Sequence, residues 1–289
     1  MASQRILKTV WTLCLIGLGV ALIFLTFSPD IRLAERFGGA TLFLIIGVLA
    51  FFAEYVDSSL GMGYGTTLTP MLMIFGFSPL QVVPAVLLSE FISGITSGAL
   101  HHRTGNVDLG RGTRARRTMQ ILVACSVVGT VAAVLLAVSL PKPIVKGYIG
   151  FMILGIGFFI IYGRRLMGRF SWGKIIGVGT IAAFNKGISG GGYGPVVTGG
   201  QILSGVGEKS AIGITSFAEG LVCLVGLILY LVLQGGVAWG LALPLMLGAI
   251  LSVPAAVWTV KIMPERLLRR SIGYATLFLG VLTLIRVVL

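Results

Sequence analysis

Two short glycine clusters of similar sequence interrupt apolar stretches of this 289-residue chain. They read Gly61-Met62-Gly63-Tyr64-Gly65 and Gly190-Gly191-Gly192-Tyr193-Gly194. If the apolar stretches cross a membrane, glycine-rich backbone is tolerated there only where protein buries it or it lines a wet cavity. A helix that begins at such a break presents free N–H groups and about half a positive charge, which suits an anion. Two such helix ends predict an anion-binding site.

Hydroxyl, amide and ammonium groups near the two clusters supply further hydrogen-bond donors for the same anion. Glycines of this kind also allow helices to cross closely, but the repetition, and the short helix that follows each cluster, favour a binding site. The candidate substrate-binding residues are Ser58, Ser59, Gly61, Gly63, Tyr64, Gly65, Thr66, Asn185, Lys186, Ser189, Gly190, Gly192, Tyr193 and Gly194.

Five ionisable residues fall inside apolar runs: Glu54, Asp57, Glu90, Lys186 and Glu219. Each would cost about 3 kcal/mol or more facing lipid, so interior positions are expected. Glu90 and Glu219 either carry protons, because desolvation favours the neutral acid, or cap broken-helix backbone; the two roles are compatible. Asp57 and Lys186 occupy matching positions with opposite charge, which favours an ion pair between them over a lysine that holds the substrate.

The remaining candidates for chemistry are weak. His101 and His102 lie at the end of an apolar run beside Arg103 and are interpreted as interfacial residues rather than pH sensors. The cysteines, three in number, lie inside apolar runs without metal-ligand spacing and are interpreted as small apolar fillers. No nucleophile–base pair lies in the apolar runs, so we expect neither an enzyme nor a cofactor nor a bound metal.

The elements that must position these residues are membrane helices. Hydrophobic residues make up 56% of the chain and charged residues 11%, with a mean hydropathy of +1.01. The predicted spans are 9–27, 40–57, 64–77, 81–101, 119–140, 144–163, 174–188, 193–205, 209–234, 238–260 and 271–289. The runs 64–77 and 193–205 reach only about 20 Å at helical rise, against a hydrocarbon core of about 30 Å. Each is therefore the return arm of a hairpin, over 40–77 and 174–207.

The distribution of basic residues predicts the orientation of the chain. Of the Lys and Arg residues in the termini and connections, sixteen lie on the side of the N-terminus and the 101–118 loop, and five on the other side. The positive-inside rule then places the N-terminus in the cytoplasm, and the C-terminus in the periplasm or outside the cell. The net charge of +13 is therefore explained by basic residues in the connections that orient the chain in the membrane. Nucleic acid is not an expected partner, because the basic residues are not interleaved with stacking aromatics.

The two halves of the chain align without a gap at an offset of 129. Seven positions within 61–90 are identical to their counterparts, including a tyrosine, a threonine and Glu90 with Glu219. Each copy reads as a broken hairpin followed by three spans, so the second copy is inserted upside down. The predicted fold is an all-α polytopic membrane protein, a single domain over 1–289: one extra N-terminal helix, repeat one over about 40–163 and repeat two over about 174–289. Such inverted repeats with broken helices are typical of secondary transporters.

These features resemble the sulfite exporter TauE/SafE family of bacterial permeases. The resemblance lies in the glycine-rich hairpins, Gly61 to Pro70 and Gly187 to Gly199, and in the Glu-bearing apolar helix after each. It implies a multi-pass transporter of the bacterial inner membrane that exports sulfite, an organosulfonate or another small sulfur-containing oxyanion by alternating access. The expected partners are this anion, the lipid bilayer, protons if the carboxylates titrate, and a second copy in a homodimer. An anion channel, and a cation transporter that uses the intramembrane carboxylates, are the alternatives.

Overall fold

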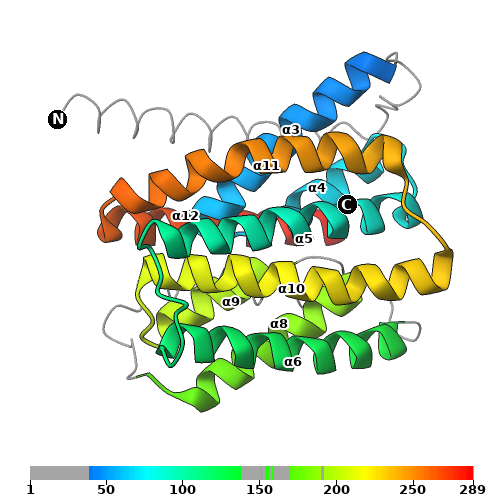
Figure 1. Ribbon diagram of the computed structural model, residues 1–289. Coiled ribbons are helices and arrows are strands. Elements are labelled where there is room, and N and C mark those ends of the chain that lie inside the picture. Colours follow the sequence, from blue (N-terminus) through cyan, green and yellow to red (C-terminus); the bar gives the residue numbers. More distant parts are fainter. Residues whose placement is uncertain are drawn as a thin grey trace.

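A computed structural model of the chain describes residues 39–137, 151, 154, 155, 158, 170–189 and 192–288. Helices joined by short connections form this part, and it contains no strand (Figure 1). The predicted first helix, 9–27, and most of the predicted span 144–163 lie outside the described residues. The helices are α3 (Gly39–Leu60), α4 (Tyr64–Ile74), α5 (Pro79–Arg103), α6 (Arg114–Ala137), α8 (Trp172–Ser189), α9 (Tyr193–Leu203), α10 (Glu208–Gln234), α11 (Trp239–Ile262) and α12 (Glu265–Val288).

Four of these helices are long and apolar enough to cross a membrane: α3, α5, α10 and α11. Helices α4 and α9 have 11 residues each, which is about 16 Å at helical rise and too short to span a bilayer. Each follows a longer helix after a break of a few residues, so that α3 with α4, and α8 with α9, form two hairpin-like units.

Two helices begin earlier than their apolar runs because they continue into charged sequence. Helix α6 begins at Arg114, where the hydroxyl of Thr113 accepts a hydrogen bond from the Arg116 N–H at 3.2 Å. Helix α12 begins at Glu265. The guanidinium of Arg114 lies 4.8 Å from the centre of the Phe170 ring, a cation–π contact that fixes the start of α6 against the segment before α8.

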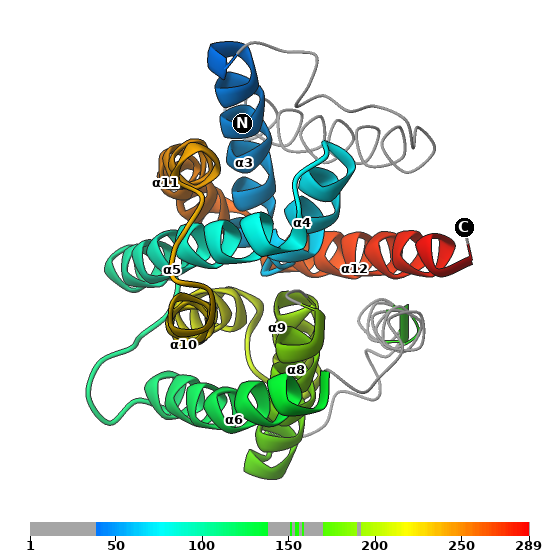
Figure 2. The same ribbon diagram turned by 90° about the vertical axis from the view of Figure 1, so that its right-hand side faces the viewer.

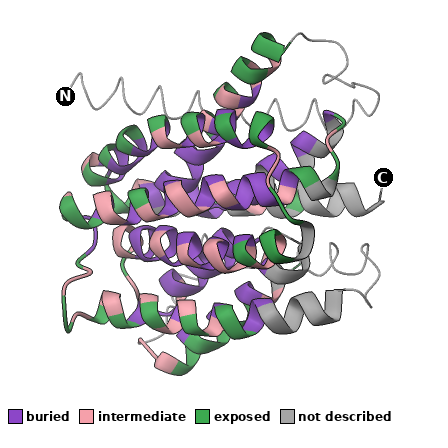
Figure 3. Cartoon of the chain, turned by 45° about the vertical axis from the view of Figure 1, so that its right-hand side comes forward, coloured by how far each residue is buried: buried purple, intermediate pink, exposed green. Residues whose placement is uncertain are grey.

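Helices α5 and α10 cross each other at the centre of the molecule (Figure 2). A Cβ built at Gly94 would lie 2.8 Å from the Ser216 carbonyl oxygen, and one built at Gly220 would lie 2.8 Å from the Ile95 nitrogen. Because only glycine fits at both positions, the two backbones touch, as in close crossings of membrane helices. Buried residues are concentrated along α5 and α10 (Figure 3).

Apart from α12, which runs between them, the other helices form one bundle on each side of this crossing (Figure 2). The first bundle packs α3, α4 and α11 onto α5. The second packs α6 and α9 onto α10, with α8 packed on α6 and α9. Within the first bundle the most extensive packing is between α3 and α11, and within the second it is between α6 and α8. Each bundle therefore contains helices from both halves of the sequence.

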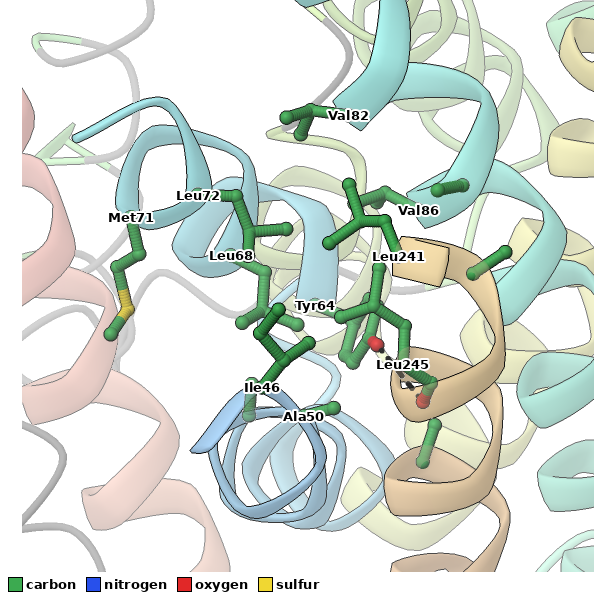
Figure 4. Packing of buried hydrophobic residues seen from close by; sticks show 14 of the residues in the cluster. Ile46, Ala50, Tyr64, Leu68, Met71, Leu72, Val82, Val86, Leu241 and Leu245 are labelled. Carbon is green, nitrogen blue, oxygen red and sulfur yellow. Dashed lines mark hydrogen bonds between the residues drawn. The ribbon is translucent and has the colours of Figure 1, made fainter. Parts of the chain in front are cut away.

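Each bundle has its own apolar core with one buried tyrosine in it. Tyr64 belongs to a cluster with Ile46, Leu68, Val86 and Leu245 (Figure 4). Tyr193 belongs to the corresponding cluster formed by α6, α8, α9 and α10. Both rings are fully buried, so the two tyrosines hold the first turns of α4 and α9 in their bundles.

Candidate functional site

The two glycine clusters form the breaks between α3 and α4 and between α8 and α9. Gly63 and Gly192, which match at the offset of 129, directly precede the short helices and have φ of 82° and 78°. This left-handed conformation costs little for glycine and is strained for residues with a side chain. The glycines therefore permit the chain to reverse direction, and the N-terminal ends of α4 and α9 lie inside the protein, where Tyr64 and Gly194 are buried.

The two breaks touch each other. A Cβ built at Gly194 would lie 2.5 Å from the Gly63 nitrogen and 2.8 Å from the Gly61 carbonyl oxygen. Gly61 in turn faces the side chain of Thr198, one turn further along α9. The first turn of α9 is therefore packed directly on the backbone of the first break, and the two helix ends share one small region.

Lys186 lies beside this region and makes two buried ion pairs. Its Nζ is 2.9 Å from Glu90 Oε2 and 2.8 Å from Glu219 Oε1. All three side chains are nearly inaccessible, with at most 4% of each exposed. Lys186 comes from α8, Glu90 from α5 and Glu219 from α10, so the triad joins the two bundles across the central crossing.

The predicted ion pair between Asp57 and Lys186 is wrong. Asp57 instead accepts a hydrogen bond from the Gly63 N–H through Oδ1, and so caps the first break. The sequence matches the positions of Asp57 and Lys186 along the chain, but the two side chains differ in length. The longer lysine reaches α5 and α10, whereas the aspartate reaches only the backbone of its own break.

Glu90 has several hydrogen-bond donors around its carboxylate. Oε1 accepts from the Gly65 N–H in the first turn of α4 at 2.8 Å, and Oε2 accepts from Lys186 and from the Cys223 thiol at 3.2 Å. Glu90 therefore caps a broken helix, which was one of the two roles expected for it. It also neutralises Lys186.

Glu219 is less well satisfied than Glu90. Its Oε1 accepts from Lys186, but its Oε2 is buried with no hydrogen-bond partner among the residues described. Buried polar atoms of native proteins are nearly always paired, so such an atom calls for a specific explanation.

Glu54 on α3 is held by two hydroxyl groups. Ser58 donates to Oε1, and Ser93 of α5 donates to Oε2 at 2.9 Å. Glu54 is 1% exposed. Together with Asp57, Glu90 and Glu219, it makes four buried carboxyl groups, two of which bind Lys186.

Several predicted site residues use their polar groups within the protein framework. The Ser58 hydroxyl is bonded to Glu54, and the Ser59 hydroxyl donates to the Val56 carbonyl at 3.3 Å. The Tyr64 hydroxyl is bonded to Ser89 at 3.0 Å and reaches the Leu245 carbonyl (Figure 4). The Tyr193 hydroxyl accepts from Ser126 at 3.1 Å. These hydroxyl groups therefore stabilise the protein framework around the two breaks.

Gly190, one of the predicted site residues, lies outside the described residues. For three other predicted site residues only the backbone is described: Thr66, Asn185 and Ser189.

Two residues near the site were misjudged from the sequence. His101 is fully buried instead of interfacial: its Nε2 bonds to the Ser58 carbonyl at 2.9 Å and its Nδ1 to the amide of Asn106 at 3.0 Å. Cys223 is a donor to Glu90 rather than a filler. Helical spacing carried the missing signal, since His101 lies about three turns after Glu90, and Cys223 about one turn after Glu219, on the same helix faces.

The arrangement supports anion binding better than coordination of a metal. In the described part of the chain, no group of three or more His, Cys, Asp or Glu side chains could hold a metal ion. Where Glu90 and Glu219 approach each other, the Lys186 ammonium already fills the position that a cation would take. The N-terminal ends of α4 and α9 attract negative charge, and at α4 the N–H groups of Gly63 and Gly65 already bind the carboxylates of Asp57 and Glu90.

Comparisons with known proteins agree with this architecture. A family model described as "Sulfite exporter TauE/SafE" matches residues 43–283. The chain is also similar to "Probable membrane transporter protein YtnM" of Bacillus subtilis (strain 168), with 29% identity over 257 residues, which cover 84% of this chain and 82% of that protein. The range matched by the family model spans both breaks and the positions of Lys186, Glu90 and Glu219. This chain belongs to the sulfite exporter TauE/SafE family and is a multi-pass membrane transporter.

Proposed function

We propose that the protein is a secondary transporter that exports a small sulfur-containing oxyanion, such as sulfite or an organosulfonate, across the bacterial inner membrane. The observation that carries the proposal is the contact between the two breaks, where Gly194 lies against Gly63 and Gly61. This contact holds the ends of the two short helices close together, so that one ligand beside it could be reached from both. The family description supplies the sulfur oxyanion, and the helix ends supply a reason for its charge.

The packing supports an inverted repeat as the framework of the site. At the offset of 129, α3 corresponds to α8, α4 to α9, α5 to α10 and α6 to α11. The packing of α3 on α11 thus corresponds to that of α8 on α6, and α5 crosses its own counterpart. Sites at the interface between such repeats lie near the midplane of the bilayer in known transporters.

Alternating access would proceed by movement of the two bundles rather than of the two sequence repeats. Because α11 packs on α3 and α6 on α8, each repeat contributes a helix to the other repeat's bundle and cannot move as a unit. The bundles meet along α5 and α10 and where the first turn of α9 packs on the first break. A rocking motion there would open the site first to one side and then to the other.

The direction of transport and the orientation of the chain in the membrane are both inferred from charge. With the N-terminus and the 101–118 loop in the cytoplasm, as the positive-inside rule predicts, an inside-negative potential drives net negative charge outward by about 2.3 kcal/mol per charge per 100 mV. Labelling of single cysteines placed in the loop, at Gly110 for example, with a membrane-impermeant reagent tests the orientation. Cysteines that react in intact cells would contradict it.

A second candidate is a cation transporter, which is favoured by four buried carboxyl groups, two of which bind Lys186. The two candidates predict opposite substrates. Purified protein in proteoliposomes should move labelled sulfite, sulfate or sulfoacetate with saturation and counterflow, with no movement of divalent cations. Movement of cations alone would replace the anion proposal, and flux without counterflow would indicate a channel.

A further inference from the structure

Glu90 and Glu219 are counterparts in the two repeats, yet their carboxyl groups have different surroundings. Both bind the same Lys186 ammonium, through Glu90 Oε2 and Glu219 Oε1. Glu90 receives two more donors, from Gly65 and Cys223. Glu219 receives none at Oε2. The symmetry of the sequence is therefore broken at the centre of the site.

The donors around Glu90 suit an ionised carboxylate. Its two oxygens accept from a backbone N–H, an ammonium and a thiol, and an ionised carboxylate is an acceptor at both oxygens. A proton would have to share an oxygen that already accepts from one of these donors. The charge of Glu90 then balances the charge of Lys186.

The same charge balance indicates that Glu219 is neutral. With Lys186 already balanced by Glu90, a second ionised carboxylate at 3% exposure would be an uncompensated charge, which is costly in a protein interior. Oε1 accepts from Lys186, so the proton resides on Oε2. The resulting O–H group is a buried donor that has no acceptor in the described part of the protein.

We propose that Glu219 carries the transported proton and donates its Oε2–H to an oxygen of the bound anion, whereas Glu90 stays ionised and positions Lys186. This proposal rests on the proposed anion transport and assigns different tasks to the two repeat mates. Because the anion meets the protonated form of Glu219, binding of the anion and binding of the proton favour each other. A monoanion would then cross the membrane without net charge and without drive from the potential, whereas a dianion would carry one net negative charge, which an inside-negative potential drives outward.

Other ionisable groups also face Glu219 and belong to the same balance. They come from every neighbouring element: Lys186 on α8, Glu90 on α5, Cys223 on α10, Asp57 and Glu54 on α3, and Tyr193 on α9. Apart from Lys186, each of them is acidic or neutral. Deprotonation of Glu219 would therefore add negative charge to a region that already has an excess of carboxyl groups.

The first test reads the protonation state directly, without any substrate. Infrared spectra of the purified protein at neutral pH should contain the carbonyl band of a protonated carboxylic acid that disappears in Glu219→Gln. In Glu90→Gln the band should also be lost, because Glu219 must then ionise to balance Lys186, whereas the double variant Lys186→Met with Glu90→Gln, which removes both charges, should retain it. Retention of the band in Glu219→Gln would overturn the assignment, as would its loss in the double variant.

The second test measures the linkage between proton binding at Glu219 and anion binding. Sulfate and sulfoacetate keep a constant charge above neutral pH, so a change in their affinity reports on the protein. For the wild-type protein, the affinity should fall about tenfold per pH unit above the pH at which Glu219 ionises. Glu219→Gln, which mimics the neutral acid, should bind with an affinity that no longer changes with pH, and the double variant Lys186→Met with Glu90→Gln, in which Glu219 keeps its proton, should keep the slope.

The two proposals fail in different ways. If neither anion binds to the wild-type protein or moves through it, the proposed function fails, and the infrared result still decides whether Glu219 is the protonated group. If the anions bind but Glu219→Gln keeps the pH dependence of the wild type, the assignment to Glu219 fails while anion transport stands.

Discussion

Gly194 lies directly against Gly63, so that a Cβ at position 194 would come within 2.5 Å of the Gly63 nitrogen. Because this contact joins the two breaks, we predict that Gly194→Ala separates them. Overpacking of this kind costs about 1–3 kcal/mol, so the thermal unfolding temperature in detergent should fall and anion transport should be lost. Gly177→Ala is the matched control, because a Cβ at this helical glycine meets nothing within 4 Å. Equal effects of the two substitutions would contradict the contact.

The break positions were predictable from the sequence, and their contact was not. Glycine clusters followed by undersized apolar runs mark where the helices stop, since few other residues tolerate the backbone of Gly63 and Gly192. Which face of α9 meets the first break depends on packing between distant helices. For this reason Tyr64 and Tyr193, which looked like ligand contacts, lie in the apolar cores instead.

Lys186→Met should be strongly destabilising. It leaves Glu90 ionised, buried and without its counter-ion, and breaking a buried ion pair on one side costs about 3–5 kcal/mol. The double variant Lys186→Met with Glu90→Gln should regain part of this loss, because the uncompensated charge is removed. Lys186→Met with Glu219→Gln should regain little, since Glu219 is already neutral. Denaturation by sodium dodecyl sulfate measures all three, and equal recovery in the two double variants would contradict the asymmetry.

His101→Leu should destabilise the protein by about 1–3 kcal/mol, since it leaves the Ser58 carbonyl and the Asn106 amide with one partner fewer in the interior. Asn106 also donates to the Val257 carbonyl at 3.0 Å, so His101 connects the last turn of α3 to α11 through the loop after α5. The neighbouring His102→Leu, at an exposed position, serves as the control. A larger loss in the His102 variant would show that the buried network contributes little.

Cys223→Ala removes one donor from the Glu90 carboxylate, and we expect a loss of about 0.5–1.5 kcal/mol. Cys223→Ser keeps a donor at the same position and should retain most of the stability. Cys125→Ala, at a half-buried free cysteine, controls for the general effect of replacing a thiol in an apolar helix. Thermal unfolding of the three variants side by side provides the measurement, and indistinguishable Ala and Ser variants at 223 would argue against a hydrogen bond.

The charges inside the membrane were partly readable from the sequence. Their number and their interior location follow from the cost of exposing them to lipid, and the site gathers all five. The partners were not readable: the offset of 129 pairs Asp57 with Lys186, yet the reach of each side chain and the angle of the α5–α10 crossing decide which groups meet. The difference between Glu90 and Glu219 likewise arises because Gly65 and Cys223 both approach Glu90.

The exchange of helices between the two bundles has a consequence for how the chain is made. Helix α3 emerges from the ribosome early, but its main packing partner α11 begins 200 residues after it (239 − 39 = 200). The face of α3 that packs on α11 therefore has no partner in the bilayer until nearly the whole polypeptide has been synthesised. Neither half of the gene encodes a unit that can complete its own core, so the two halves of such a protein must be inherited, expressed and inserted together.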